Sequence, residues 1–273
     1  MRILVSFKVT PDYEALRGPD WVAGAAGGVE TRYVRRILNC FDESALELAL
    51  RLSEAVAGHG EAASLGAVSV GGREVEPYLK TLQALGYERA ARVQAGATLD
   101  FAPAVTAALI AAYVRKVDRS DLAMLGCRSG PGDSGTVPLL VAEHLGWPCL
   151  TQVIEIEPLT DARLRVTCVV DDGVLRATLR LPVVLAVGNA LVSHLRVPTL
   201  SQRLAGRGEE LEVLSPRDVG VDLDDELRRE GCVLTGVETI DRSRPGVVIH
   251  GATPRDKARN LFDAHLKSLI EAL

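Results

Sequence analysis

Residues 122–145 read LAMLGCRSGPGDSGTVPLLVAEHL. The apolar run at the start predicts a short buried strand over residues 122–126, and the apolar spacing after the glycines predicts a helix from about residue 134 to residue 145. A strand that enters a helix through a glycine-rich loop is typical of a βαβ unit, in which consecutive strands are parallel. This stretch therefore favours an α/β fold with a parallel sheet.

The same alternation extends over the first 150 residues. Further strands are predicted over residues 3–9, 62–70, 91–94 and 150–157, and further helices over 42–57, 74–85 and 102–117. Asn39 is the expected N-cap of the first helix, with Asp42 at its third position. We expect a three-layer α/β/α fold, doubly wound around a mostly parallel sheet.

The pattern changes after residue 150. Strands over 153–157, 164–170 and 174–181, joined by turn-forming residues, predict an antiparallel extension at the sheet edge. Residues 182–187 predict one more apolar strand. The chain is then polar and irregular to residue 241, and a helix begins at Thr253 and runs to about residue 269. We expect an α/β domain over residues 1–187, and a partner-docking loop, an extended arm and a terminal helix over 188–273.

Composition argues against several classes of function. Hydrophobic residues make up 47% of the 273 residues but aromatic residues only 4%, so the core must be built mainly from Ala, Val and Leu. A net charge of −5, with no dense Lys/Arg cluster, gives no support for nucleic-acid binding. The five cysteines have no metal-binding spacing, so we expect no metal site and a reducing compartment, the cytoplasm. No apolar run reaches the roughly 18 residues of a membrane span, and Met1 leads directly into a strand, so we expect neither membrane insertion nor a targeting segment.

The candidate site lies where two segments leave the sheet. Ligands of open α/β sheets bind beyond the carboxyl ends of the strands, where the strand order reverses. Residues 6–13 follow the first strand and residues 126–137 follow the fourth. The glycines let the backbone of the second segment turn N–H groups inward, and with the helix N-terminus these form a phosphate cradle. Ser129, Ser134 and Thr136 add hydroxyl donors and Arg128 adds charge. A tight turn without a ligand is the alternative interpretation.

Two enzyme motifs compete with this interpretation. Residues 132–135 read GDSG, as around the nucleophile of chymotrypsin-like proteases, but His59 is the only upstream histidine and the disulfide-bonded β-barrel is missing. Residues 129–134 resemble the SGGxDS pyrophosphate loop of ATP pyrophosphatases, although that loop follows the first strand of its domain and Pro131 here replaces a glycine. An adenylating enzyme and a universal-stress-type nucleotide-binding protein remain alternatives. Cys127 is interpreted as a small apolar filler, reactive only if its pKa is lowered.

The chain resembles the beta subunit of electron-transfer flavoproteins, including the FixA-like branch. The similarity covers nearly the whole length, and the matching segments follow in the family's order. They are the opening strand and turn over residues 3–13, the N-P-F-x-E-x-A-like helix start over 39–45, the loop over 126–137 with 145–148, and the segments 171–173, 181–182, 218–222 and 244–248.

The resemblance implies an electron carrier without catalytic residues of its own, which passes electrons from dehydrogenases to a downstream acceptor. A larger alpha subunit would hold most of an FAD, while this chain would complete the flavin pocket and bind AMP or a second FAD. Tyr13 and Phe41 match aromatic residues near the flavin, although each could equally be an interface contact. The residues expected at the nucleotide are Ser6, Asn39, Cys40, Phe41, Asp42, Val70, Gly126, Cys127, Arg128, Ser129, Gly130, Pro131, Gly132, Asp133, Ser134, Gly135, Thr136 and Val137.

The chain also departs from the family pattern. Cys40 replaces a proline, and Thr136 stands where the family usually has glutamine. Residues 188–200 occupy the place where the family docks its flavin dehydrogenase, and Leu191 is the expected apolar anchor, but the local sequence differs. These departures leave open whether AMP or FAD is bound and which dehydrogenase is the redox partner.

Overall fold

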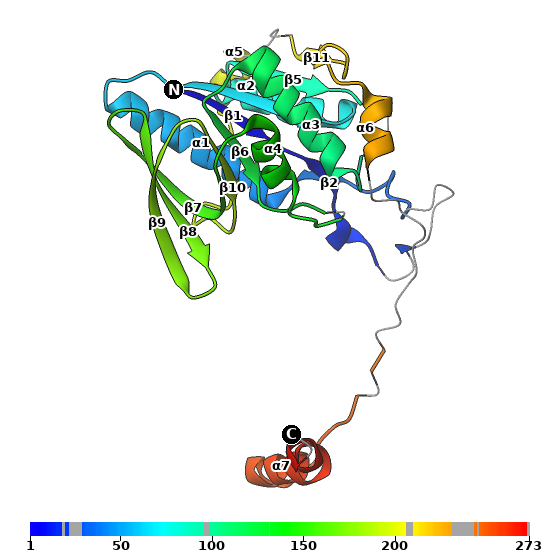
Figure 1. Cartoon of the computed structure of the whole chain (residues 1–273). Coiled ribbons are helices and arrows are strands. Elements are labelled where there is room, and N and C mark those ends of the chain that lie inside the picture. Colours follow the sequence, from blue (N-terminus) through cyan, green and yellow to red (C-terminus); the bar gives the residue numbers. More distant parts are fainter. Residues whose placement is uncertain are drawn as a thin grey trace. The chain divides into compact units, whose positions relative to one another are not determined.

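A nine-stranded sheet forms the centre of the structure, a computed structural model (Figure 1). The structure describes residues 1–17, 20–21, 29–95, 99–130, 132–205, 210–230, 243–244 and 246–271. The strand order is β11-β5-β4-β1-β6-β10-β7-β8-β9. The strands are β1 (Arg2–Ser6), β4 (Ser64–Val70), β5 (Arg89–Val93), β6 (Leu122–Gly126), β7 (Cys149–Leu159), β8 (Arg163–Val170), β9 (Gly173–Arg180), β10 (Val183–Val187) and β11 (Glu212–Leu214).

The strand order reverses beside β1. From β1 the chain runs to β4 and β5 on one side and then to β6 on the other, and all these neighbours pair in parallel. Ser6 at the end of β1 aligns with Leu125 near the end of β6. Strands β8 and β9 add the antiparallel extension. The predicted fold class, a mostly parallel, doubly wound sheet with an antiparallel part, is confirmed.

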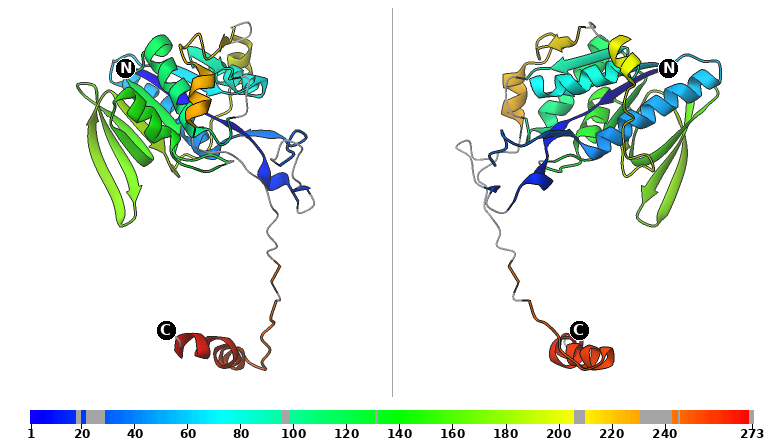
Figure 2. Two further views of the ribbon diagram at one scale, coloured as in Figure 1. Left: turned by 45° about the vertical axis from the view of Figure 1, so that its right-hand side comes forward. Right: turned by 180° about the vertical axis from the view of Figure 1, so that it is seen from behind.

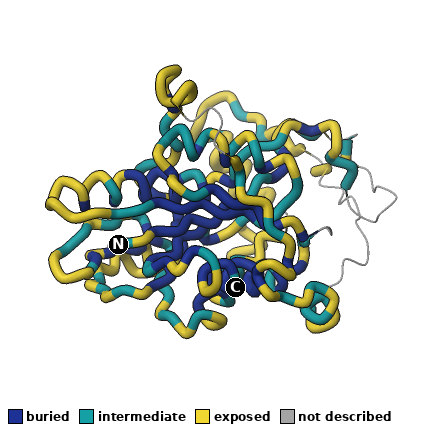
Figure 3. Tube along the Cα trace, turned by 90° about the horizontal axis from the view of Figure 1, so that it is seen from above, coloured by how far each residue is buried: buried dark blue, intermediate teal, exposed yellow. Residues whose placement is uncertain are grey.

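Helices cover both faces of the sheet, because successive side chains of a buried strand point to opposite sides. On β1, Ile3 and Val5 pack with α1 (Cys40–Gly58) and α2 (Glu76–Ala84), while Leu4 packs with α3 (Pro103–Tyr113). The helix α4 (Val137–Leu145) covers the same face as α3, where it packs on β6 and β10. A π-helical turn, η4 (Val114–Asp118), extends α3. Figure 3 shows the buried strands at the centre with exposed segments around them.

Two sequence-based boundaries differ from the structure. The strand predicted over residues 3–9 ends at Ser6, and a separate strand β2 (Val9–Pro11) pairs with β3 (Arg36–Leu38). The helix predicted from residue 134 begins at Val137, with Pro138 in its first turn. Residues 134–136 therefore stay in the loop, where their polar groups can face a ligand.

The prediction of an irregular stretch from residue 188 to 241 is wrong for its described part. It contains α5 (Leu200–Ala205), β11 and α6 (Leu223–Arg229), and Val219 is buried in the core. These elements are too short to give a periodic signal, and β11 forms only because β5 offers it an open edge. Residues 206–209 and 231–241 of this stretch lie outside the described residues.

Two compact units divide the chain, residues 1–237 and 238–273. In the second unit, Thr253 and Asp256 form a capping box at the start of α7 (Pro254–Leu261), where a helix was predicted, and the helix continues through the π-helical η5 (Phe262–Leu266) into α8 (Lys267–Glu271). No helix among the described residues has the length and apolar character to cross a bilayer. The functional division at residue 187 stays a prediction.

Strand β10 enters the middle of the sheet, between β6 and β7, so its side chains are fully enclosed. We expect Leu185→Ala to lower the free energy of unfolding by about 2–5 kcal/mol, because it leaves a cavity in the core. The matched control is Leu191→Ala, since Leu191 is 88% exposed, and it should change stability by less than about 0.5 kcal/mol. Urea denaturation followed by circular dichroism measures both, and equal effects would contradict the central position of β10.

Candidate functional site

The candidate site lies at the reversal of the strand order, where the segments that follow β1 and β6 meet. The side-chain amide of Asn39 donates to the carbonyl oxygen of Arg128 at 2.8 Å. Lys8 forms an ion pair with Asp100 at 3.2 Å. A Cβ placed on Gly130 would lie 3.8 Å from the ring of Tyr13. The two segments expected to form the site are therefore neighbours.

The carboxylate of Asp42 joins three parts of this site. One oxygen accepts from the backbone N–H of Gly126 at 2.6 Å, at the end of β6. The other accepts from the backbone N–H of Lys8 at 2.9 Å and from the side chain of Asn39 at 3.0 Å. Burial raises the pKa of Asp42 to about 6, although these three donors and the charge of Lys8 act to lower it. The side chain is buried and holds the exits of β1 and β6 against the start of α1.

Asn39 has the predicted position before α1 but not the predicted role. Its backbone is extended, as at an N-cap, yet its side chain forms no capping hydrogen bond. The side-chain amide instead donates to Asp42 and to Arg128. The NH2 group of Asn39 is a donor and cannot satisfy the backbone N–H groups of the helix. Its hydrogen bond to Arg128 instead connects the start of α1 to the glycine-rich loop.

Several backbone N–H groups of the glycine-rich loop have no acceptor among the described residues. Within the loop, Cys127 N–H donates to the carbonyl of Val187 at 2.8 Å and Asp133 N–H to the carbonyl of Ser129 at 3.1 Å. Other backbone N–H groups of the loop donate to no residue that the structure describes; they are those of Arg128, Ser129, Gly130, Gly132, Ser134 and Gly135. Gly132 (φ 93°) and Gly135 (φ 65°) have left-handed backbone, which turns the chain sharply within the loop.

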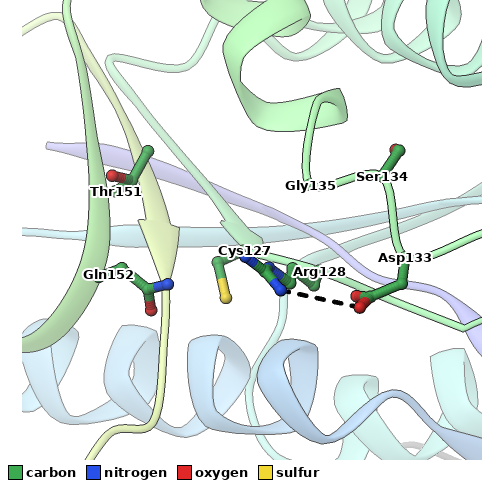
Figure 4. A pocket seen from close by; sticks show the side chains of 7 residues that line it. All are labelled: Cys127, Arg128, Asp133, Ser134, Gly135, Thr151 and Gln152. Atoms are coloured by element: carbon green, nitrogen blue, oxygen red, sulfur yellow. Dashed lines mark ion pairs between the residues drawn. The ribbon is translucent and has the colours of Figure 1, made fainter. Parts of the chain in front are cut away.

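A pocket of about 280 Å³ adjoins these donors (Figure 4). Its lining comes from the loop and from the start of β7, and consists of Cys127, Arg128, Asp133, Ser134, Gly135, Thr151 and Gln152. Arg128 and Asp133 lie 3.8 Å apart across it and are both more than half exposed. A cavity with backbone donors, a guanidinium group and hydroxyl groups can receive a phosphate.

Thr151 and Gln152 line the pocket although no sequence pattern predicts them there. They enter the pocket because β10 pairs with β7, and the register of that pair shifts near this point. Gln152 has a left-handed backbone with φ 53°, which is uncommon for a residue other than glycine. A Cβ on Gly188 would overlap the Gln152 side chain. The local sequence shows only a strand start, so no signal within it identifies these residues.

The remaining predicted nucleotide residues that the structure describes do not line this pocket. Ser6 ends β1 and Val70 ends β4, both at the carboxyl edge of the sheet. A Cβ on Gly126 would lie 2.8 Å from the Cβ of Phe41, so Phe41 packs closely under the loop. Cys40 is exposed in the first turn of α1, Thr136 and Val137 lead into α4, and Pro131 lies outside the described residues. Their contacts with a nucleotide stay a prediction.

Aromatic and thiol groups complete the surroundings. The ring of Tyr13 stacks on Trp21 with 6.0 Å between centroids. Burial, and then the charge of Asp100, raises the pKa of Tyr13. Burial also raises the pKa of Cys127 to about 11, so at neutral pH the group is a thiol and not a nucleophile. This agrees with its interpretation as an apolar filler.

The geometry also separates Ser134 from the candidate base of a serine protease. His59 is the C-cap of α1, whose first turn lies at the site. A helix of 19 residues rises about 28 Å at 1.5 Å per residue, so His59 is at its far end. Among the described residues, no group of three or more His, Cys, Asp and Glu side chains could hold a metal ion.

Because its pKa is raised in the folded chain, Asp42 should make stability depend on pH. The folded state favours the protonated form of Asp42. The contribution of this group to the free energy of unfolding is therefore complete below the unfolded pKa near 4, and it is lost as the pH rises through about 6. We expect the stability of the wild type relative to Asp42→Asn to fall by on the order of 3 kcal/mol over this window. Urea denaturation of both proteins between pH 4 and 7 measures the two free energies of unfolding. A difference between them that stays constant with pH would contradict a raised pKa of Asp42.

Comparisons with known proteins point to one family. The family model described as "Electron transfer flavoprotein domain" matches residues 27–218. The chain is 32% identical to a proposed electron transfer flavoprotein subunit, YgcR, of Escherichia coli (strain K12), over 99% of this chain and 100% of that protein. It is 27% identical to the electron transfer flavoprotein subunit beta of Bacillus subtilis over 96% of each chain, and 28% identical to that of Homo sapiens over 83% of this chain and 86% of the relative. The chain therefore belongs to the electron transfer flavoprotein family, with beta subunits among its relatives.

Proposed function

We propose that the chain is the small, nucleotide-binding subunit of a heterodimeric electron-transfer flavoprotein. In this role it binds AMP, or a second FAD, and completes the FAD site of a larger alpha subunit. The complex passes electrons from a dehydrogenase to a downstream acceptor in the cytoplasm. Membership of the family supports the electron-transfer role. The free thiols of Cys40, Cys127, Cys149 and Cys168 agree with a reducing compartment.

The observation that carries the proposal is the glycine-rich loop facing the exit of β1. Its unpaired N–H groups, the charge of Arg128 and the start of α4 together suit the phosphate of a nucleotide. Ser6 and Val70 end β1 and β4 at the same edge of the sheet, so ribose and adenine would lie beside them. The bound nucleotide would have a structural role and would stabilise the folded chain. A ligand present at a hundred times its dissociation constant adds about 2.7 kcal/mol to the free energy of unfolding.

The chain itself supplies position and not bond-making chemistry. FAD, when bound, carries the electrons. Tyr13 and Phe41 contribute apolar surface beside the loop, where they could form one edge of a flavin pocket. The larger subunit would supply the rest of that pocket.

Residues 188–200 form the proposed docking segment for a dehydrogenase. Leu191, Val197 and Leu200 expose apolar side chains in or at the end of this segment. Helix α1 fixes its backbone, because Glu43 accepts from Leu195 N–H and the buried Glu47 accepts from Arg196 N–H and its guanidinium group. Burial acts to raise the pKa of Glu47, but the hydrogen bonds from Arg196 and Arg51 hold it below its ordinary value. The ion pair keeps an apolar surface in a fixed place.

The first test is co-expression with the large subunit encoded in the same genome. We expect a yellow complex of the two chains in equal numbers, from which denaturation releases FAD together with AMP or a second equivalent of FAD. Absorption spectroscopy and mass spectrometry of the released nucleotides measure this. A colourless chain that does not bind the large subunit would count against the proposal. A chain that hydrolyses ATP with release of pyrophosphate would also count against it.

Arg128→Gln tests the phosphate site within that complex. Loss of a charge-assisted hydrogen bond costs about 1.5–3 kcal/mol, so we expect the affinity for the small-subunit nucleotide to fall by tenfold or more. Arg217→Gln is the matched control, since Arg217 is an exposed arginine in a turn away from the pocket lining. Equilibrium dialysis against the released nucleotide gives both affinities, and equal values would show that Arg128 does not contact the phosphate.

Leu191→Ser tests the docking segment. The exposed leucine makes no core contact, so we expect the spectrum and stability of the complex to stay unchanged while its reduction by a dehydrogenase slows by tenfold or more. Stopped-flow absorption at the flavin band measures the rate. The exposed Val213 on β11 is the control position, as Val213→Ser, and a rate equal to that of the control would remove Leu191 from the docking surface.

A further inference from the structure

Gln152 near the start of β7 has a backbone conformation that its residue type disfavours. Its φ of 53° lies in the left-handed region, which residues other than glycine seldom adopt. The side chain packs on the backbone of Gly188, where a Cβ would overlap the Gln152 amide oxygen and lie 3.1 Å from the Gln152 Cα. The N–H of Gly188 donates to the carbonyl of Val153, the next residue of β7, at 2.9 Å. The conformation of Gln152 therefore depends on a glycine at residue 188.

The side-chain amide of Gln152 has no hydrogen-bond partner in the part of the chain that the structure describes. It lines the pocket beside the glycine-rich loop, and Figure 4 shows it pointing toward Cys127. The hydroxyl group of Thr151, which also lines the pocket, has no described partner either. Disfavoured backbone conformations cluster at ligand sites, where the surrounding structure maintains them. An unpaired amide held in this way at a pocket indicates a ligand-binding role.

The pocket lies on the side of β6 that faces away from β1. In the sheet order, β10 and β7 follow β6 on one side, whereas β1 and β4 are on the other, as the sequence colours of Figure 2 show. Gln152 belongs to β7, while Ser6 and Val70 end β1 and β4 and do not line the pocket. A nucleotide with its ribose and adenine beside Ser6 and Val70 would reach Gln152 only with groups beyond its first phosphate.

Hydrogen-bond donors line the pocket on two walls. On the loop wall, the N–H groups of Arg128, Ser134 and Gly135 donate to no described residue. On the β7 wall, the amide of Gln152 and the hydroxyl of Thr151 are the donors. The loop wall alone suits one phosphate, so the second wall can serve a further group with acceptor oxygens. The pocket of about 280 Å³ has space for such a group.

We propose that Gln152 is a specificity-determining residue that binds the second phosphate of a diphosphate-containing adenine nucleotide. The proposal rests on the proposed function for the adenine-nucleotide site itself. The loop binds the first phosphate, and Gln152 and Thr151 donate to oxygens of the second from across the pocket. AMP has no group that reaches Gln152. The pocket therefore favours a nucleotide of the ADP or FAD type over AMP.

One charge in the pocket opposes a second phosphate. The carboxylate of Asp133 lies 3.8 Å from the guanidinium group of Arg128, and both side chains are more than half exposed. Replacing Asp133 by asparagine removes the repulsion and leaves Arg128 free for the ligand. We expect Asp133→Asn to strengthen the binding of ADP by about threefold or more, and to strengthen that of AMP less.

The test compares AMP with ADP, which carries the diphosphate of FAD without the flavin. Equilibrium dialysis of the co-expressed complex, freed of its small-subunit nucleotide, gives both dissociation constants. We expect the wild type to bind ADP about tenfold more tightly than AMP. Gln152→Leu should remove this preference and change the affinity for AMP by less than twofold. Gln83→Leu is the matched control, since Gln83 lies on α2 and does not line the pocket.

Gln152→Gly separates ligand binding from folding. Glycine adopts the left-handed conformation without strain, so thermal melting of this variant should occur at the same temperature as in the wild type or higher. Its preference for ADP should nevertheless be lost. A lower melting temperature with an unchanged preference would show that Gln152 has only a structural role.

Two results would distinguish this proposal from the proposed function. Equal affinities of the wild type for AMP and ADP, or an effect of Gln152→Leu within twofold of the Gln83→Leu control, would overturn the role of Gln152 and leave the proposed function intact. A flavin-free complex whose small subunit binds neither nucleotide would overturn the proposed function instead.

Discussion

The buried carboxylate of Asp42 is the constraint on which the site depends. Two carboxylate oxygens reach the backbone after β1, the backbone at the end of β6 and the side chain before α1. The loop that follows β6 therefore begins at a residue that this carboxylate holds. Gly126 must lack a side chain for this contact, because a Cβ there would lie 2.5 Å from the carboxylate oxygen. Burying a carboxylate requires free energy of desolvation. The hydrogen bonds that partly offset this desolvation are the same ones that shape the site.

Much of the fold follows from local pattern. The apolar runs of β1, β4 and β6 and the amphipathic spacing of α1 give both the element types and the parallel arrangement, because buried parallel strands and their covering helices leave clear periodicities. The two segments of the site follow from the same reasoning, since the strand order must reverse beside β1. The capping box at Thr253 and Asp256 is also readable from residue types alone.

Other features depend on distant residues and have no local signal. The place of β10 between β6 and β7 is decided by pairing across the sheet, and with it the entry of Thr151 and Gln152 into the pocket. Asn39 shows the same limit, because its residue type predicts a cap but a carboxylate and a carbonyl compete for its amide. The short elements after residue 188 are stabilised by an open edge and by one buried valine, neither of which a window of sequence reveals.

The insertion of β10 also sets an order of assembly. A chain leaving the ribosome presents β6 and β7 long before β10, yet these two strands have no direct pairing and can be joined only through it. The first N–H of the glycine-rich loop beyond β6 is held by the carbonyl of Val187, the last residue of that strand. Until synthesis passes this point, the loop lacks one of its supports and both flanking strands keep an open edge. The pocket is thus among the later parts of the first unit to become ordered, and a nascent chain halted earlier would be the form most exposed to mispairing.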